Sequence, residues 1–316
     1  MAHLSICTVY CQKICPLVNK QQQRIETPNN RPLRQSLKEY ARGITGGLLF
    51  SFPLLYTMEV WWAGFSAKPH ELLALVFVTY VLLLGYNRYA GMRPDVTWRS
   101  VMVDSVEEMG IGLILSFTVL LMINRIDFTS MSIDEVMGKV IIEAMAVSIG
   151  VSIGTAQLGE GGVSGDSEEE GERELAEKDF VPSELRSKVA VAVLSLCGAI
   201  IVGGNIAPTE EIIMLALQAT PVHIFTMALA SIFLSIIIVY FSDFKGAAKN
   251  TSVRELIFQV TFDTSISYIM ALVASAFSLW FFGRFDGVSW WVAFSQCITL
   301  GLVASLGASA GRLLIK

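Results

Sequence analysis

Long runs of apolar residues, separated by short polar clusters, form the main pattern of the chain. Eight runs cover approximately residues 44–62, 71–86, 101–123, 136–157, 188–207, 222–241, 256–282 and 289–311. The runs are continuous and rich in Leu, Ala, Gly and Ser, whereas the strands of a membrane barrel alternate apolar and polar residues. A helix needs about 20 residues to cross the hydrocarbon core. The pattern therefore predicts an all-α membrane protein with about eight transmembrane helices, of which 71–86 is the shortest.

Composition agrees with this class. Of the 316 residues, 53% are hydrophobic and 16% are charged, whereas soluble proteins average about 25% charged residues. Disorder and a nucleic-acid-binding module are excluded, and the expected partner is the lipid bilayer. The sequence has no H-E-x-x-H, P-loop, G-x-S-x-G or C-x-x-C motif. We therefore expect no enzymatic activity and no resident cofactor.

The positions of the basic residues indicate the orientation. They gather before the first run, in the second and sixth connections, and after the last run: Lys13, Lys20, Arg24, Arg31, Arg34, Lys38, Arg42, Arg88, Arg93, Arg99, Lys245, Lys249, Arg254, Arg312 and Lys316. Because cytoplasmic loops carry the excess of Lys and Arg, both termini are expected in the cytoplasm. We expect a plasma membrane that is crossed several times; the family resemblance given below implies that it is a bacterial inner membrane.

Four segments are predicted along the chain. Residues 1–38 form a cytoplasmic leader without a signal-peptide pattern, in which Cys7, Cys11 and Cys15 are either reduced thiols or sites of acylation or metal binding. Residues 39–158 hold four spans and 188–316 hold the other four. Between them, residues 159–187 form an acidic cytoplasmic linker, which serves as a solvated tether or as a regulatory segment.

The two sets of four spans share short motifs in the same order, which predicts an internal repeat. The matches are Thr57-x-Glu59 with Thr209-x-Glu211, each followed by Ala-x-Pro; Arg99 and Glu108 with Arg254 and Asp263; and residues 148–154 (SIGVSIG) with 305–311 (SLGASAG). With four spans each, the halves enter from the same side and form parallel repeats. Small residues spaced four apart allow close helix packing, and also association between copies of the chain.

Ionisable residues inside the spans are nearly all acidic, and they are candidates for function because they are costly there. They are Glu59, Asp104, Glu107, Glu108, Glu143, Glu210, Glu211 and Asp263. The one base, Lys139, is expected to pair with Glu143 four residues on. Glu108 and Asp263 are predicted as an inner pair, and Glu59 and Glu211 as an outer pair. A purely acidic set suits cations or protons, although Glu59 and Glu211 are equally explained as wetted groups at helix ends.

Two helices are expected to be irregular. Pro53 interrupts the first run, and residues 203–208 (GGNIAP) end the fifth. Proline frees backbone carbonyls, and carbonyl oxygens beside carboxylates and Asn205 are ligands for hard cations. Residues 209–219 are interpreted either as a short outer or re-entrant helix or as a kink followed by a helix that Thr209 caps.

Two segments carry resemblances to known families. Residues 42–62 (RGITGGLLFSFPLLYTMEVWW) and 203–211 (GGNIAPTEE) resemble a bacterial integral-membrane protein family of unknown function, over most of the chain after the leader. Residues 204–211 are also similar to the Gly/Asn…Pro-Glu motif of the cation/calcium exchanger superfamily, whose acidic residues ligate the ion. That superfamily uses inverted five-helix repeats, and Pro53 stands where the second half has Asn205. The second likeness therefore implies chemistry rather than fold.

These observations lead to two functional hypotheses. The first is a cation transporter or channel, for Ca²⁺ or another divalent cation with proton coupling, whose path is formed by Glu59, Glu108, Glu211 and Asp263 with Asn205. The second is a structural or regulatory membrane protein without transport activity, in which the acids fix helix packing and the linker recruits a partner.

Overall fold

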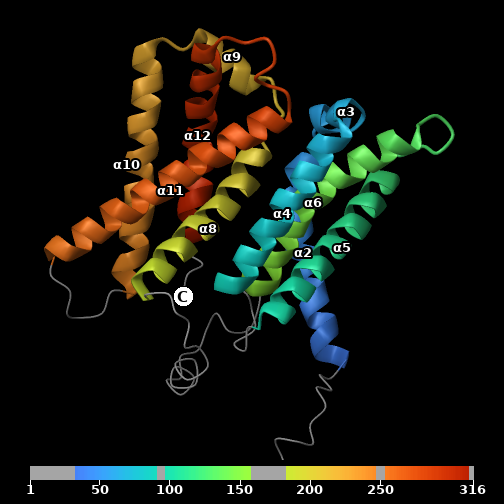
Figure 1. Cartoon of the computed structure of the whole chain (residues 1–316), viewed down its shortest axis with the longest axis horizontal. Coiled ribbons are helices and arrows are strands. Elements are labelled where there is room, and N and C mark those ends of the chain that lie inside the picture. The colour runs from blue at the N-terminus through green and yellow to red at the C-terminus, as the bar shows by residue number, and fades with distance from the viewer. Residues whose placement is uncertain (1–32, 91–96, 158–182, 247–252, 313–316) are drawn as a thin grey trace, which may run out of the picture. The chain divides into compact units, whose positions relative to one another are not determined.

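The computed structural model describes residues 33–90, 97–157, 183–246 and 253–312, which form ten helices (Figure 1). From Ala41 onward the chain forms one compact unit. Residues 1–32 of the predicted leader, with its three cysteines, and residues 159–182 of the predicted linker lie outside the described residues. Residues 33–38 of the leader and 183–187 of the linker are helical instead.

The helices are divided between a first half, before residue 158, and a second half, after residue 182. The first half contains α2 (Leu33–Leu55), α3 (Met58–Ser66), α4 (Pro69–Tyr89), α5 (Trp98–Met122) and α6 (Ile133–Gln157). The second half contains α8 (Ser183–Gly204), α9 (Glu211–Gln218), α10 (Pro221–Gly246), α11 (Val253–Phe281) and α12 (Trp290–Arg312). The described residues contain no strand, which confirms the all-α class.

Among the described helices, seven are long and apolar enough to span a membrane, and the bent pair α2–α3 makes an eighth if it is one broken span. This agrees with the eight runs of the sequence. With 21 residues, α4 is longer than the predicted span 71–86. Pro69 stands at its first turn, and the backbone N–H of Lys68 donates to the Glu71 carboxylate at 2.8 Å, so the helix begins earlier than the apolar run.

The predicted interruption at Pro53 is confirmed. Helix α2 ends two residues after it, and α3 continues at an angle of 84°. A proline ring cannot donate a hydrogen bond and clashes with the carbonyl four residues earlier, which opens the helix. The carbonyls at the end of α2 find other donors: the Thr57 hydroxyl donates to the Pro53 carbonyl at 2.6 Å, and the Thr57 N–H donates to that of Leu54 at 3.0 Å.

Glycines join the first and last helix of each half, as the small-residue spacing predicted. In the first half, a Cβ added to Gly46 of α2 would fall against Cα of Gly154 in α6. In the second half, a Cβ on Gly198 of α8 would lie 3.0 Å from Cα of Gly311 in α12 and closer still to the carbonyl oxygen of Gly307. The backbones therefore touch. Membrane helices associate through such close packing because lipid is as apolar as a leucine side chain, so there is no hydrophobic driving force between them.

Helices α5 and α11 end in the same way. Asn124 and Gly283, the second residue after each helix, have φ values of +58° and +66°. The next residues, Arg125 and Arg284, donate their backbone N–H to a carbonyl five positions back, at 2.8 Å in both cases. This left-handed closure satisfies carbonyls at a helix end. The halves thus share the order of their elements and a helix-end geometry, while the duplication itself stays a prediction.

Candidate functional site

Glu108 lies in a buried polar cluster between α4, α5 and α6. Asn87 Nδ2 donates to Glu108 Oε2 at 2.7 Å and to Ser105 Oγ at 3.1 Å. Asn87 Oδ1 in turn accepts a hydrogen bond from Ser152 Oγ at 3.0 Å. Glu108 is only 9% exposed. A carboxylate removed from water loses most of its solvation, and the amide of Asn87 replaces part of it.

Local sequence accounts for two sides of this cluster. Ser105 and Glu108 are three residues apart and lie on one face of α5. Close contact between α5 and α6, where a Cβ on Gly112 would meet Ser148, brings Ser152 of α6 near. Sequence reasoning missed Asn87, because the predicted span ended at residue 86. The signal that could have identified Asn87 was a carboxamide side chain directly after an apolar run.

Asp263 of α11 forms an ion pair with α8. Lys188 Nζ lies 3.0 Å from Asp263 Oδ1, and the two side chains are 26% and 14% exposed. The same ammonium lies 4.7 Å from the ring centroid of Phe262, a distance at which cation and ring attract each other. Sequence reasoning did not identify Lys188 as a partner of Asp263. Its pairing with Asp263 depends on the packing of α8 against α11.

Glu59 and Glu211 occupy matching positions, in the first turns of α3 and α9. Glu59 is half-buried and Glu211 is exposed. Hydrogen bonds from its own backbone N–H and from the Thr209 hydroxyl, together with the charge of Arg284, hold the pKa of Glu211 below its ordinary value of 4.5. Residues 211–218 form the short helix α9, and its N-terminal capping position is held by Glu210 rather than Thr209. An outer or re-entrant placement of this helix stays a prediction.

Asn205 joins the two interrupted helices. Its Oδ1 accepts a hydrogen bond from the Leu54 N–H at 3.0 Å, and its Nδ2 donates to the Phe50 carbonyl at 3.1 Å and to the Ile201 carbonyl. In a regular helix the Leu54 N–H would bond to the Phe50 carbonyl directly. The carboxamide is therefore inserted into the helical hydrogen bond that the Pro53 break opens, and both of its N–H groups are used by backbone.

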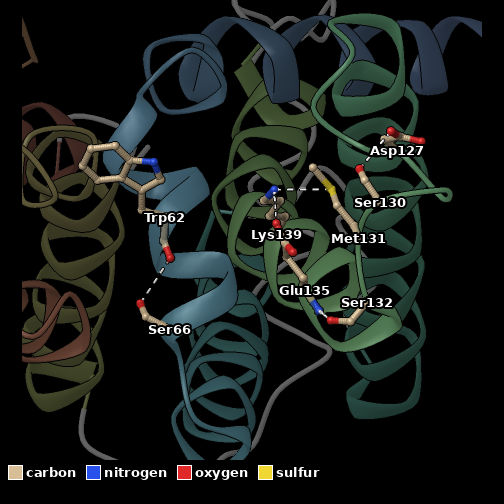
Figure 2. Close-up of polar contacts among 8 residues, drawn as sticks. All are labelled: Trp62, Ser66, Asp127, Ser130, Met131, Ser132, Glu135 and Lys139. Atoms are coloured by element: carbon tan, nitrogen blue, oxygen red, sulfur yellow. Dashed lines mark hydrogen bonds and ion pairs between the residues drawn. The ribbon is translucent and has the colours of Figure 1, made fainter.

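The expected ion pair between Lys139 and Glu143 is wrong. Lys139 Nζ instead lies 2.6 Å from Glu135 Oε1, one turn in the opposite direction, and 3.5 Å from Met131 Sδ (Figure 2). Both neighbours stand four residues away on the same face, so spacing alone does not choose between them. Glu135 is 25% exposed, whereas Glu143 is fully buried. Pairing near the helix start avoids carrying the ammonium deeper into the apolar core.

The turn between α5 and α6 is organised by Asp127. Its Oδ1 accepts from the Thr129 hydroxyl at 2.7 Å and the Thr129 N–H at 2.9 Å. Its Oδ2 accepts from the Ser130 hydroxyl at 2.9 Å (Figure 2). These bonds, the Thr129 hydroxyl foremost, lower the pKa of Asp127 from its ordinary 3.8. In the same turn, the guanidinium of Arg125 lies 3.9 Å from the ring centroid of Trp61 in α3.

Replacing Thr129 by valine is expected to raise the pKa of Asp127 toward 3.8, because the main hydrogen bond to the ionised form is removed. A lowered carboxyl pKa stabilises the folded turn above the ordinary value, and this stabilisation is lost as pH falls through the lowered one. Titration of the ¹³C-labelled carboxyl by NMR measures the shift. Ser66→Ala, which removes a hydroxyl bonded to the Trp62 carbonyl (Figure 2), is the control. An unchanged Asp127 pKa in Thr129→Val would contradict the assignment.

The predicted site residues are distributed over several places. Glu108 contacts α4, Asp263 contacts α8, and Asn205 contacts α2. In the part of the chain that the structure describes, no three His, Cys, Asp or Glu residues are grouped so that they could hold a metal ion. Cation binding by Glu59, Glu108, Glu211, Asp263 and Asn205 stays a prediction.

Comparison with known proteins yields one match. No curated protein and no solved structure matches the chain. Residues 39–315 match an integral membrane protein family of unknown function, designated DUF2391, which is not the cation/calcium exchanger superfamily. The match begins at Glu39, in the second turn of α2, and covers every described helix from there to α12. Its description agrees with the seven to eight apolar helices that could span a membrane. The chain therefore belongs to the integral membrane protein family DUF2391.

Proposed function

We propose that the chain is a proton-linked cation transporter or channel in which Glu108 exchanges a proton for a cation. The observation that carries this proposal is the Glu108 cluster: a 9% exposed carboxylate inside a span, held by an amide at 2.7 Å. An ionisable group in the membrane interior is costly and marks an ion or proton path by default. No ion identity follows from the family.

The neighbours of Glu108 suit exchange. Asn87, Ser105 and Ser152 are neutral, so they stabilise the ionised carboxylate without neutralising it. Asp104 and Glu107 on the same helix add negative potential that attracts cations. A proton satisfies one carboxylate completely, whereas Ca²⁺ takes six to eight oxygen ligands. Among cations, the proton is therefore the ion that this cluster favours most, with Ca²⁺ as the divalent candidate.

The second half differs at the matching position. Asp263 is paired with Lys188 at 3.0 Å, so an internal cation already lies where Glu108 would accept an external one. This asymmetry assigns the exchange step to the first half. We further propose that both termini face the bacterial cytoplasm, that the halves are parallel repeats, and that Asp263 responds to ions only after Lys188 is removed.

Flux through purified protein in proteoliposomes tests the proposal. A pH-sensitive dye inside the vesicles reports proton movement while gradients of Na⁺, K⁺, Mg²⁺ and Ca²⁺ are imposed in turn. We expect the wild type to collapse a pH gradient with at least one cation, and Glu108→Gln to lower the rate at least ~10-fold, because the exchanging carboxylate is gone. Glu107→Gln, one residue away on α5, removes only the neighbouring negative potential; it is the matched control and should lower the rate far less than Glu108→Gln does.

Two outcomes would contradict transport by this cluster. One is the absence of flux for every cation, and the other is an unchanged rate in Glu108→Gln. Either would favour the structural alternative, for which the Asp263–Lys188 pair and the Asn205 bridge are the supporting observations: both use polar groups to join helices.

A further inference from the structure

Glu143 is the most deeply buried carboxyl of the described residues. Its side chain has no exposed surface, and neither carboxyl oxygen has a hydrogen-bond partner among the residues that the structure describes. Buried polar groups in proteins are nearly always hydrogen-bonded. An unpartnered carboxyl in a membrane core therefore needs an explanation.

The bend between α2 and α3 covers the face of α6 on which Glu143 lies. One helical turn after Glu143, Val147 packs against α2: a Cβ added to Gly47 would lie 3.1 Å from the Val147 side chain. One turn toward its start, Lys139 packs against Gly64 of α3. Glu143 lies midway between these two contacts. The broken helix thus encloses the carboxyl from two directions.

The elements around this face supply no counter-charge inside the core. Residues 43–55 of α2, 72–87 of α4, 109–122 of α5 and 189–204 of α8 contain no Asp, Glu, Lys, Arg or His. The neighbouring basic side chains have other partners. Lys139 forms an ion pair with Glu135, and the guanidinium of Arg125 lies over the Trp61 ring. Glu59, in the first turn of α3, is half-buried and carries the same charge as Glu143 would.

In the predicted repeat, the position that matches Glu143 is Leu300 of the second half. Leu300 stands five residues before Ser305, as Glu143 stands five residues before Ser148. Leu300 is fully buried in an apolar cluster with Ala207, Ile212 and Leu279. A position that takes leucine in one half and glutamate in the other can hold the glutamate in its neutral form, because an ionised carboxylate without donors is strongly disfavoured in such an environment.

We propose that Glu143 is a proton-binding site, whose carboxyl carries a proton at neutral pH inside the α2–α3 bend. The ligand is the proton, since a metal cation would need further oxygen ligands that this apolar face does not offer. The site is separate from the Glu108 cluster: Ser152, which belongs to that cluster, is nine residues along α6 and on its opposite face. The proposal therefore does not depend on transport.

Infrared spectroscopy of the full chain in lipid vesicles tests this proposal. The carbonyl stretch of a protonated carboxyl is separate from the carboxylate and amide bands and shifts in D₂O. We expect the wild type to show this band at neutral pH, and Glu143→Gln and Glu143→Leu to lose that component. Glu143→Leu places at this position the side chain that the second half already holds, which favours its folding. Asp134→Asn, at an exposed position in the first turn of α6, is the matched control and should keep the component.

Absence of the protonated band from the wild type at neutral pH would overturn the proposal without any variant. An unchanged band in Glu143→Leu would overturn it as well. If neither Glu143 variant folds, Glu108→Gln decides: a protonated band that remains supports Glu143, and complete loss of the band assigns it to Glu108 instead.

Discussion

Gly198→Ala is expected to lower the free energy of unfolding by about 3 kcal/mol, the upper part of the usual range for overpacking. A Cβ at this position would lie 3.0 Å from Cα of Gly311 and closer to the carbonyl oxygen of Gly307. These are backbone atoms of α12, so no side chain can rotate away to make room. The helices must separate along a contact that is among the most extensive in the protein.

The measurement is the midpoint of thermal unfolding in detergent or lipid, compared with Gly110→Ala. Gly110 lies inside α5, and a Cβ there meets nothing within 4 Å. Both substitutions gain the same helix propensity, so the difference between them isolates the clash. Gly46→Ala, at the α2–α6 contact, should behave like Gly198→Ala. Equal midpoints for Gly198→Ala and Gly110→Ala would show that α8 and α12 do not touch through their backbones.

Asn205→Ala is expected to cost about 2–4 kcal/mol of stability. It removes three hydrogen bonds at once and leaves the Leu54 N–H and the Phe50 carbonyl without their partner. Each unsatisfied buried backbone group costs ~1–3 kcal/mol, and hydrogen bonds inside membranes fall in the lower part of that range. Thr209→Val, which removes the local hydrogen bonds of one hydroxyl to the Ile206 carbonyl and to the exposed Glu211, is the control and should cost less than ~1 kcal/mol.

A double-variant cycle sharpens this prediction. Asn205 is needed because Pro53 keeps α2 open, so Pro53→Ala should let the Leu54 N–H bond to the Phe50 carbonyl directly. Asn205→Ala should therefore be milder in the Pro53→Ala background, and the coupling energy measures the bridge. Additive effects of the two substitutions would mean that the carboxamide and the break act independently.

Much of the fold could be predicted from local pattern. The apolar runs indicated the spans, Pro53 the break in α2, and the four-residue spacing of Ser and Gly the contacts of α6 and α12. Each of these signals depends on neighbours within one or two helical turns, a range over which helix geometry relates sequence to space directly.

The candidate site could be predicted only in part. Glu108 was identified as an ionisable residue within a span, but its partner Asn87 was not, and Lys139 was assigned to the wrong carboxylate. The two choices open to Lys139 have equal spacing along α6, and only the difference in depth between Glu135 and Glu143 separates them. How deeply each carboxyl is buried depends on how all the helices pack together.

Sequence alone determined the class of this protein, the number of its apolar helices and the short set of acids among them, because these follow from composition and period. Tertiary structure decided the partners: Asn87 for Glu108, Lys188 for Asp263, and the backbone of α2 for Asn205. Each pair joins separate helices, and which residues meet there depends on the crossing and register of whole helices. The crossing and register of the helices result from many small packing contacts along each helix–helix interface rather than from the residues that form the pair.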